Sequence, residues 1–205
     1  GECGTLKNPF AKFYSAVWHI ARPVILLFHP IEVTGKENLP EEPALFCANH
    51  SSAWDPVLLF CALKGEYPLR IMAKKQLFSI PVVGGFLRML GVFPVDRGHS
   101  DIGAVKTAIR SLRDGFSLLM FPEGTRVEAP GREPAKPGIS VVAIRSGVNF
   151  LPVFIGIQKK LFQKVPIIIG KPMAPAYTGR KGTAEEYQEN ADRVMARIYE
   201  LGGVK

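Results

Sequence analysis

Residues 44–63 read ALFCANHSSAWDPVLLFCAL, and this stretch decides the fold. Its opening residues, 44–48, form an apolar run of the kind found in buried strands, and residues 56–63 have the pattern of a helix. Pro56 suits the first turn of that helix, because a proline there removes no intrahelical hydrogen bond. A strand that passes through a polar turn into a helix is typical of an α/β domain, in which helices flank a sheet.

The rest of the chain continues this alternation of strand and helix signals. Further strands are predicted at 31–34, 69–73, 92–95, 117–121, 151–155 and 165–169. Helices are predicted at 80–90, at 100–112 with Ser100 as N-cap, at 139–146, and from the capping box Thr183-Ala-Glu-Glu186 to about Leu201. The segment 122–138, rich in glycine, proline and charge, is predicted to be a loop. We therefore expect one α/β domain at 31–205, with a largely parallel mixed sheet flanked by helices.

Residues 1–30 are expected to form a membrane-associating segment ahead of this domain. The part from Pro9 to Ile31 is apolar and aromatic, but basic residues and prolines interrupt it. Its longest unbroken apolar piece, 24–28, is far shorter than the roughly 20 residues that span a bilayer. Aromatic and basic residues at helical spacing fit a helix that lies in the membrane interface. An ordinary amphipathic helix packed on the domain is the alternative.

The composition points to an anionic partner. The chain has 205 residues and a formal net charge of +8, a balance that fits a phosphate-bearing substrate, an anionic membrane surface or an acidic carrier protein. Its basic residues are scattered rather than grouped, so nucleic acid is disfavoured as a partner. The three cysteines, Cys3, Cys47 and Cys61, lack metal-like spacing, and their odd number disfavours a disulfide scaffold. We expect no metal.

His50 and Asp55 are the first candidate catalytic residues. Both lie in NHSSAWD, 49–55, directly after a buried strand, where open α/β sheets place their active sites. Histidine is suited to proton transfer near neutral pH. Across a turn, Asp55 could accept a hydrogen bond from one ring nitrogen and leave the other as the base. The alternative is that Asp55 is only the N-cap of the following helix and His50 a turn histidine.

A second candidate site is FPEGTR, 121–126, which also follows a buried strand. Gly124 would let backbone approach a ligand closely, and Arg126 offers a planar fork for phosphate. Glu123 could bind a hydroxyl or position Arg126, although a surface turn with an ion pair would have the same sequence. The segment 74–98, with Lys74-Lys75 and Val95-Asp96-Arg97, is either a basic rim that receives phosphate or a solvated surface.

Four blocks at these spacings resemble those of the glycerophosphate acyltransferase family. They are NHSSAWD, VFPVDRG at 92–98, FPEGTR and LPVFIG at 151–156, and the resemblance covers roughly Ile31 to Lys171. Within the family the chain is most similar to the short bacterial 1-acyl-sn-glycerol-3-phosphate acyltransferases. The resemblance implies a glycerol-3-phosphate acyltransferase-like fold and transfer of a fatty acyl group from a thioester to a lysophosphatidic-acid-type acceptor, as part of phospholipid biosynthesis.

The resemblance also implies residue roles. His50 would be the general base and Asp55 would orient it. The acceptor and its phosphate would be bound by Asn49, Glu123, Gly124, Thr125, Arg126, Arg97 and Lys75. Pro152 would shape the side of the acyl donor. The basic pair that many members carry after the third block is thinned here, and Lys136-Pro137-Gly138 matches it only in part.

The implied reaction is direct transfer without a covalent enzyme intermediate. The chain has no G-x-S-x-G elbow, no HExxH, no P-loop and no GxGxxG. We therefore expect no cofactor, with acyl-CoA or acyl carrier protein as the co-substrate. Backbone N–H groups near Asn49 to Ser52 or at Gly124 are candidate oxyanion donors. The enzyme would be bound to the cytoplasmic side of the membrane, as a peripheral or monotopic protein.

Three other activities are compatible with the same motifs. One is acylation of glycerol 3-phosphate itself or of another lysolipid, since these blocks serve all such acceptors. A second is hydrolysis of the thioester, because His50 could activate water as readily as an alcohol. A third is a lipid-binding protein without activity, which an intact His50 and Asp55 disfavour.

Overall fold

The computed structural model describes residues 11–63, 69–96, 102–127, 129, 131 and 133–204. Within this part of the chain, one seven-stranded sheet has the order β1-β7-β6-β2-β5-β3-β4. Its strands are β1 (Ile31–Thr34), β2 (Leu45–Ala48), β3 (Leu69–Lys74), β4 (Phe93–Val95), β5 (Ser117–Met120), β6 (Phe150–Ile155) and β7 (Val165–Ile169). All neighbours are parallel except β6 and β7, so the predicted mixed, largely parallel sheet is confirmed.

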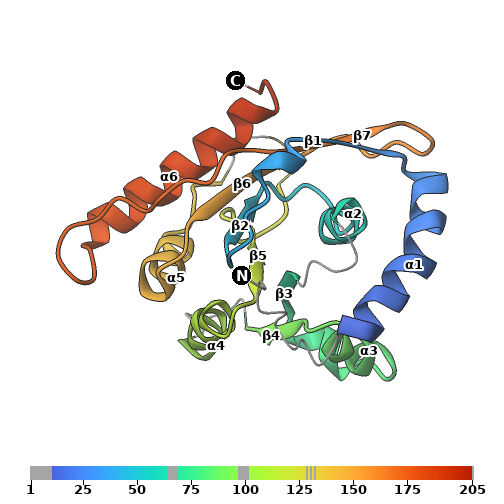
Figure 1. The fold of residues 1–205 in the computed structure, drawn as a ribbon, viewed down its shortest axis with the longest axis horizontal. Helices are drawn as coiled ribbons and strands as arrows, with labels where there is room; N and C mark the ends of the chain where they lie inside the picture. The colour runs from blue at the N-terminus through green and yellow to red at the C-terminus, as the bar shows by residue number, and fades with distance from the viewer. Residues whose placement is uncertain are drawn as a thin grey trace, which may run out of the picture.

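Helices cover both faces of the sheet, as the α/β prediction requires (Figure 1). They are α1 (Ala11–Phe28), α2 (Asp55–Ala62), α3 (Val83–Met89), α4 (Ile102–Arg113), α5 (Gly138–Ser146) and α6 (Ala184–Leu201), with short 3-10 helices η1 (Lys36–Asn38) and η2 (Lys75–Ser79). The predicted capping box is present, since Thr183 and Glu186 each accept the other's backbone N–H. The proposed N-cap Ser100 lies outside the described residues.

Two apolar layers enclose the sheet. On one face, α4, α5 and α6 bury Leu112, Val142 and Val194 against β2, β5 and β6. On the other face, α2 buries Leu58 and Leu59, and α2 lies between the sheet and α1 (Figure 1). Burial of such side chains is the main source of stability for a domain of this type.

The parallel strands bring five chain segments to one edge of the sheet. Because β2, β3, β4, β5 and β6 run in the same direction, their carboxyl ends meet there. The turn after β2 contains His50, and the loop after β5 contains Glu123. The chain leaves β2 through α2 on one face and β5 through α5 on the other. Such a point of divergence is where open α/β sheets form their binding crevices.

Helix α1 packs on the domain through one side only. Tyr14 is buried with Phe60 and Cys61 of α2, and the Trp18 indole donates a hydrogen bond to the Leu63 carbonyl at 2.8 Å. The outward side of the helix is apolar and exposed, with Ile20 72% and Leu27 65% exposed. None of the helices in the described part of the chain has the length and apolar content needed to cross a membrane.

Candidate active site

His50 and Asp55 form a buried pair at the carboxyl end of β2. The His50 Nδ1 lies 3.0 Å from the Asp55 Oδ2, and both residues are almost entirely buried. The same Oδ2 accepts the backbone N–H groups of Ser51 at 2.8 Å and Ser52 at 2.7 Å. Asp55 is the first residue of α2, and its carboxylate is therefore turned back toward the preceding turn. The contact predicted across the turn is present, which favours the pair over a simple helix cap.

The surroundings keep Asp55 ionised. Burial acts to raise its pKa, but the hydrogen bond from His50 and the ammonium of Lys159 outweigh burial, so that the pKa is lowered from its ordinary value. An ionised carboxylate accepts hydrogen bonds only, which places the ring proton of neutral His50 on Nδ1. The Nε2 then carries a free lone pair, as a general base requires.

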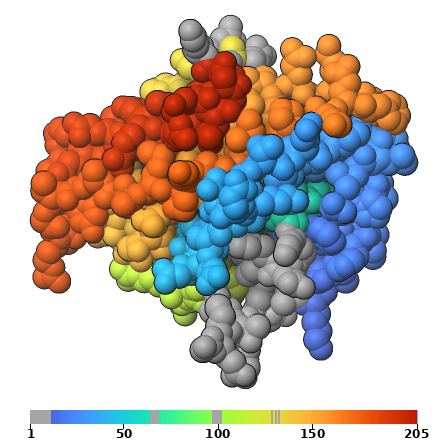
Figure 2. Space-filling view, turned by 45° about the horizontal axis from the view of Figure 1, so that its top comes forward, coloured from blue at the N-terminus to red at the C-terminus, as the bar shows by residue number. Residues whose placement is uncertain are grey.

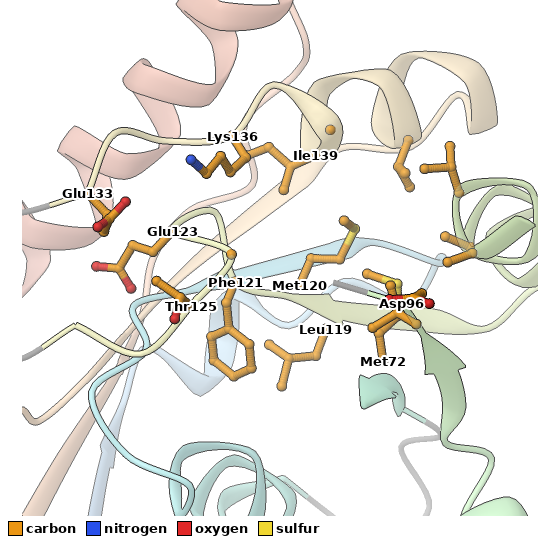
Figure 3. Close-up of a pocket in the computed structure, with 17 residues that line it drawn as sticks. Met72, Asp96, Leu119, Met120, Phe121, Glu123, Thr125, Glu133, Lys136 and Ile139 are labelled. Carbon is orange, nitrogen blue, oxygen red and sulfur yellow. The ribbon is translucent and has the colours of Figure 1, made fainter. Parts of the chain in front are cut away.

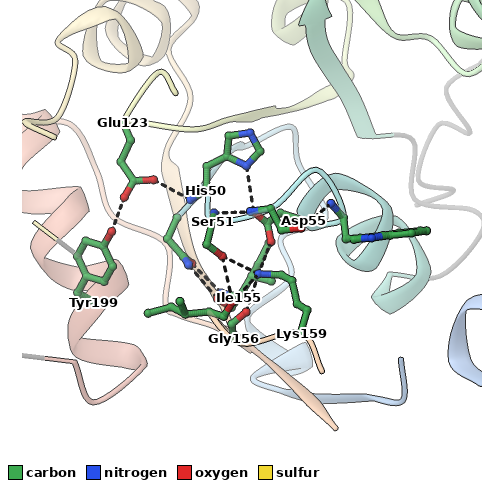
Figure 4. A network of polar contacts seen from close by, with 12 residues as sticks. His50, Ser51, Asp55, Glu123, Ile155, Gly156, Lys159 and Tyr199 are labelled. Carbon is green, nitrogen blue, oxygen red and sulfur yellow. Dashed lines mark hydrogen bonds and ion pairs between the residues drawn. The ribbon is translucent and has the colours of Figure 1, made fainter. Parts of the chain in front are cut away.

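Glu123 holds the turn that contains His50. Its Oε2 accepts the backbone N–H of His50 at 2.7 Å, and its Oε1 accepts the hydroxyl of Tyr199 from α6 (Figure 4). Burial raises the pKa of this carboxyl, which is 1% exposed. At the other backbone polar group of the same residue, the Val127 N–H donates to the His50 carbonyl at 2.8 Å. Glu123, which was predicted to bind the acceptor, thus holds the His50 backbone, and it also lines the cavity described below.

Asn49 is also a positioning residue, although a role in substrate binding was predicted for it. Its side-chain amide donates to the carbonyl of Ile155 and accepts that residue's N–H, both at 2.8 Å. The amide thus makes the two hydrogen bonds that the backbone of a neighbouring strand would make, and it joins the end of β2 to the end of β6. With 1% exposure, Asn49 has no surface left for a ligand.

The predicted oxyanion donors are occupied by protein acceptors. The N–H groups of His50, Ser51 and Ser52 donate to carboxylates, and the N–H of Gly124 donates to the Phe121 carbonyl at 3.0 Å. These four groups shape the turn and the loop in this structure. In this arrangement these four N–H groups are not free to bind an oxyanion.

A largely apolar cavity of about 650 Å³ opens beside the pair (Figure 3). It lies between the sheet and the helices α4 and α5, where Met72, Ala108, Leu119, Met120 and Val142 line it. Its wall next to the pair is Phe121, whose ring stacks on the His50 imidazole with 4.0 Å between ring centroids. The cavity has a size typical of small-molecule sites.

Polar groups gather at one end of this cavity. Glu123, Gly124, Thr125, Glu133 and Lys136 line that end, away from Met72 and Asp96 (Figure 3). Gly124 has a left-handed backbone with a φ of 71°, and a Cβ there would lie 3.3 Å from the Lys136 side chain. The positive φ is the main reason that a glycine is favoured here.

The remaining predicted residues have different positions. Arg126 follows Thr125 and is exposed, and Lys75 is exposed at the start of η2, after β3. Arg97 lies outside the described residues. Pro152 is buried inside β6, opposite Cys47 of β2 and next to Gly170. The structure therefore gives Pro152 a place in the core and does not bring it to the pair.

Three residues of the site were not identified from sequence. Lys159 contacts Asp55 from the chain that follows β6, Tyr199 contacts Glu123 from α6, and Lys136 lines the cavity. Lys136 had a signal, since it partly matches a basic pair of the resembled family. Lys159 and Tyr199 had none, because they stand among other charged residues in segments far along the chain.

Comparisons with known proteins agree on one family. The family model described as acyltransferase matches residues 30–156. A 1-acyl-sn-glycerol-3-phosphate acyltransferase of Bacillus subtilis is 31% identical, over 83% of this chain and 87% of its own length. Another protein of that name, from Pseudomonas aeruginosa, is 30% identical, over 85% of this chain and 71% of its own length.

A solved structure supports the same relationship. The crystal structure of the 1-acyl-sn-glycerophosphate (LPA) acyltransferase PlsC from Thermotoga maritima superposes with a TM-score of 0.71 at 26% identity. The match covers 95% of this chain and 80% of that one. The match therefore extends well beyond the motif blocks.

Proposed function

This chain belongs to the acyltransferase family, and from that premise we propose that it acylates the free hydroxyl of 1-acyl-sn-glycerol 3-phosphate, forming phosphatidic acid. The acyl donor is a thioester, either acyl-CoA or an acyl carrier protein. The observation that carries the proposal is the His50–Asp55 pair beside a largely apolar cavity with polar groups, Lys136 among them, at one end. An acyl chain and a phosphate are the two parts of the ligands that such a cavity fits.

The His50–Asp55 pair supports general-base catalysis. His50 Nε2 takes the proton from the acceptor hydroxyl while the oxygen attacks the thioester carbonyl carbon, which gives a tetrahedral oxyanion. The oxyanion collapses, the carbon–sulfur bond breaks, and the leaving thiolate receives the proton from His50. Asp55 holds the ring and stabilises the imidazolium that forms between these steps. A positioned base of this kind contributes about 10²–10⁴-fold to the rate.

The polar end of the cavity, which carries Lys136 together with the carboxyl groups of Glu123 and Glu133, is the proposed phosphate site. Lys136 lines that end, and Thr125 contributes a hydroxyl. Arg126, next in the chain and exposed, adds a guanidinium that matches phosphate geometry. Lys75 follows β3 at the same edge of the sheet. Lys75 and Arg97 remain proposed contributors to acceptor binding.

A surface on the outer side of α1 is proposed to contact the membrane. This α1 apolar surface consists of exposed side chains of α1 and of the β6–β7 connection: Ile20, Val24, Leu27, Phe28, Leu161 and Phe162. The two segments adjoin, since the Phe162 N–H donates to the Phe28 carbonyl at 2.7 Å (Figure 2). Lys12, His19 and Arg22 lie on α1, which has no acidic residue. Apolar side chains with basic neighbours favour an anionic bilayer interface.

Helix α3 extends this apolar area. Val82, Phe86 and Met89 are exposed, and the Phe86 ring lies 6.0 Å from that of Phe13 on α1.

Two residues of this apolar area have an unusual backbone. Among the described residues, Val82 and Phe162 are the only non-glycine residues with a positive φ. This backbone conformation is unfavourable for side chains of their kind. Both present an exposed apolar side chain, which is what insertion into an interface requires.

An acceptor comparison tests the proposed substrate. The protein is given one acyl thioester and, in parallel, 1-acyl-sn-glycerol 3-phosphate, glycerol 3-phosphate, a lysolipid without a terminal phosphate, or buffer. We expect the largest kcat/KM with 1-acyl-sn-glycerol 3-phosphate and little free fatty acid in buffer. A larger kcat/KM with glycerol 3-phosphate would contradict the proposed acceptor, and hydrolysis in buffer at the transfer rate would contradict the reaction class. Repeating the best reaction with acyl-CoA and with acyl carrier protein identifies the donor.

A further inference from the structure

Lys159 is a buried cation whose partners all belong to the active-site region. Its ammonium lies 2.7 Å from Asp55 Oδ1, on the opposite side of the carboxylate from His50, and its side chain is 5% exposed. The same ammonium donates to the Ser51 hydroxyl at 2.6 Å and to the Gly156 carbonyl at 2.7 Å (Figure 4). A buried ammonium is costly unless it is paired and hydrogen-bonded, and Lys159 is both.

The fold fixes this lysine in place. Lys159 follows β6. The side chain of Asn49, which immediately precedes His50, is hydrogen-bonded to the backbone of Ile155, the last residue of β6. Gly156 lets the chain pass close to β7, because a Cβ at this position would lie 2.6 Å from the Pro166 ring. The next residue, Lys160, is exposed. The burial of one lysine and the exposure of its neighbour are therefore set by the path of the chain after β6, since the two side chains are chemically identical.

We infer that Lys159 is a positioning residue of the acyl transfer reaction, which balances the charge of Asp55 so that His50 rests as the neutral base. The inference rests on the proposed function, in which neutral His50 accepts the hydroxyl proton. With Lys159 in place, Asp55 and Lys159 together carry no net charge, and a proton on His50 adds an uncompensated charge to a buried site. Without Lys159, a proton on His50 would balance the charge of Asp55, and the ring would hold that proton more readily.

The other groups that face His50 strengthen this expectation. Glu123, from the loop after β5, contacts the His50 backbone, and Asp55 contacts its ring from α2. The ring's stacking partner, Phe121, is uncharged. Among these groups and Lys159, the lysine is the only cation, so its removal leaves one carboxylate on the imidazole, a second carboxyl group on the His50 backbone, and no cation among them. A proton on His50 then becomes easier to hold.

The test is the titration of the His50 ring by NMR in wild type and in Lys159→Met. The resonance is assigned by its loss in His50→Ala. We expect the midpoint to move upward by about one pH unit in Lys159→Met, as for the loss of a like charge a few ångströms away. Lys160→Met is the matched control, since it removes the same charge from an exposed neighbour, and its midpoint should stay in place. An unchanged midpoint in folded Lys159→Met would overturn the inference.

Activity and two further variants complete the test. The acid limb of kcat/KM should move upward with the His50 midpoint, with activity recovering at higher pH, whereas a merely structural lysine would lower activity equally at all pH values. Lys159→Arg keeps the charge and should keep the wild-type midpoint. Should Lys159→Met fail to fold, Lys159→Gln is titrated in its place, and the same upward shift of the His50 midpoint is expected. A midpoint that moves upward in folded Lys159→Arg would overturn the inference. Because the titration needs no substrate, it stands even where the acceptor assignment fails.

Discussion

The network around Asp55 and the α1 apolar surface differ in burial: polar groups are buried in the first, and apolar groups are exposed in the second. Around Asp55, the carboxylate has donors from His50, Ser51, Ser52 and Lys159, and the side chains of the charged pair are almost fully buried. On the α1 apolar surface, large side chains such as Leu27 and Phe162 are mostly exposed. In the first region the carboxylate has its hydrogen-bond and charge partners within the protein, whereas in the second region apolar surface remains exposed to the surroundings.

This difference shows which kind of function each region can perform. A base must be held in one orientation and one protonation state, and buried hydrogen bonds provide both. Docking on a bilayer needs area rather than a fixed geometry, since the energy of transfer scales with the apolar surface removed from water. Single substitutions should therefore have severe effects in the network and small effects on the surface.

The largest effect is expected from Asp55→Asn. The amide nitrogen that replaces one carboxylate oxygen cannot accept the donors that now surround Asp55, and the His50 ring loses the partner that fixes its tautomer. We expect kcat to fall by a factor on the order of 10³–10⁴, as for other histidines deprived of their aspartate. Steady-state transfer assays at several pH values measure this, with circular dichroism as the folding control. A loss below tenfold would show that Asp55 is only a helix-end residue.

An intermediate effect is expected from Tyr199→Phe. The change removes one donor from the buried Glu123 carboxylate without altering the size of the ring. A buried acceptor left unsatisfied costs about 1–3 kcal/mol, so the free energy of unfolding should fall by that amount. Denaturant unfolding measures the loss. Tyr177→Phe, at an exposed tyrosine, is the control. An equal loss in both variants would contradict a stabilising role for the Tyr199–Glu123 hydrogen bond.

A smaller effect is expected from Lys136→Met. The cavity loses the cation at its polar end, and the KM for 1-acyl-sn-glycerol 3-phosphate should rise by about tenfold, the equivalent of one charged hydrogen bond. The KM for the acyl thioester should stay within twofold, because the change is confined to the phosphate end. A rise in the thioester KM alone would place the donor, rather than the acceptor phosphate, at Lys136.

The smallest effect per residue is expected on the α1 apolar surface. The triple change Ile20→Ser, Leu27→Ser and Phe162→Ser should reduce binding to anionic liposomes severalfold, while the protein stays folded because these side chains are exposed. Transfer to a detergent-dispersed acceptor should be unchanged. Tyr177→Ser is the control, since it removes an exposed aromatic side chain from a different part of the chain. Undiminished co-sedimentation of the triple variant with anionic liposomes would contradict the membrane assignment.

The sequence predicted the parts of the site that depend on local order. The apolar run before His50 and the proline after Asp55 predict a strand, a turn and a helix, and that arrangement brings the two side chains together. The parallel sheet then makes the positions of the turn after β2 and the loop after β5 predictable, because both follow carboxyl strand ends. The capping box at Thr183 was predictable for the same local reason.

Contacts between distant segments were beyond reach of the sequence. Asn49 has a residue type suited to ligand binding, but its amide is consumed by the backbone of β6. Lys159 and Lys160 are adjacent residues of the same type, and only the path of the chain after β6 determines which of them is buried. Pro152 matches a motif, yet its position inside β6 removes it from the cavity. In each case the partner lies many residues away, so no local pattern carries the information.

Acyl transfer to 1-acyl-sn-glycerol 3-phosphate by wild type and His50→Ala tests the central claim most directly. The account predicts transfer by the wild type and a loss of several orders of magnitude in a variant whose circular dichroism and unfolding transition show an intact fold. The alanine also removes the ring that stacks on Phe121, so His50→Gln, which retains bulk, is measured beside it and should be equally inactive. Transfer that persists in either folded variant would contradict His50 as the base.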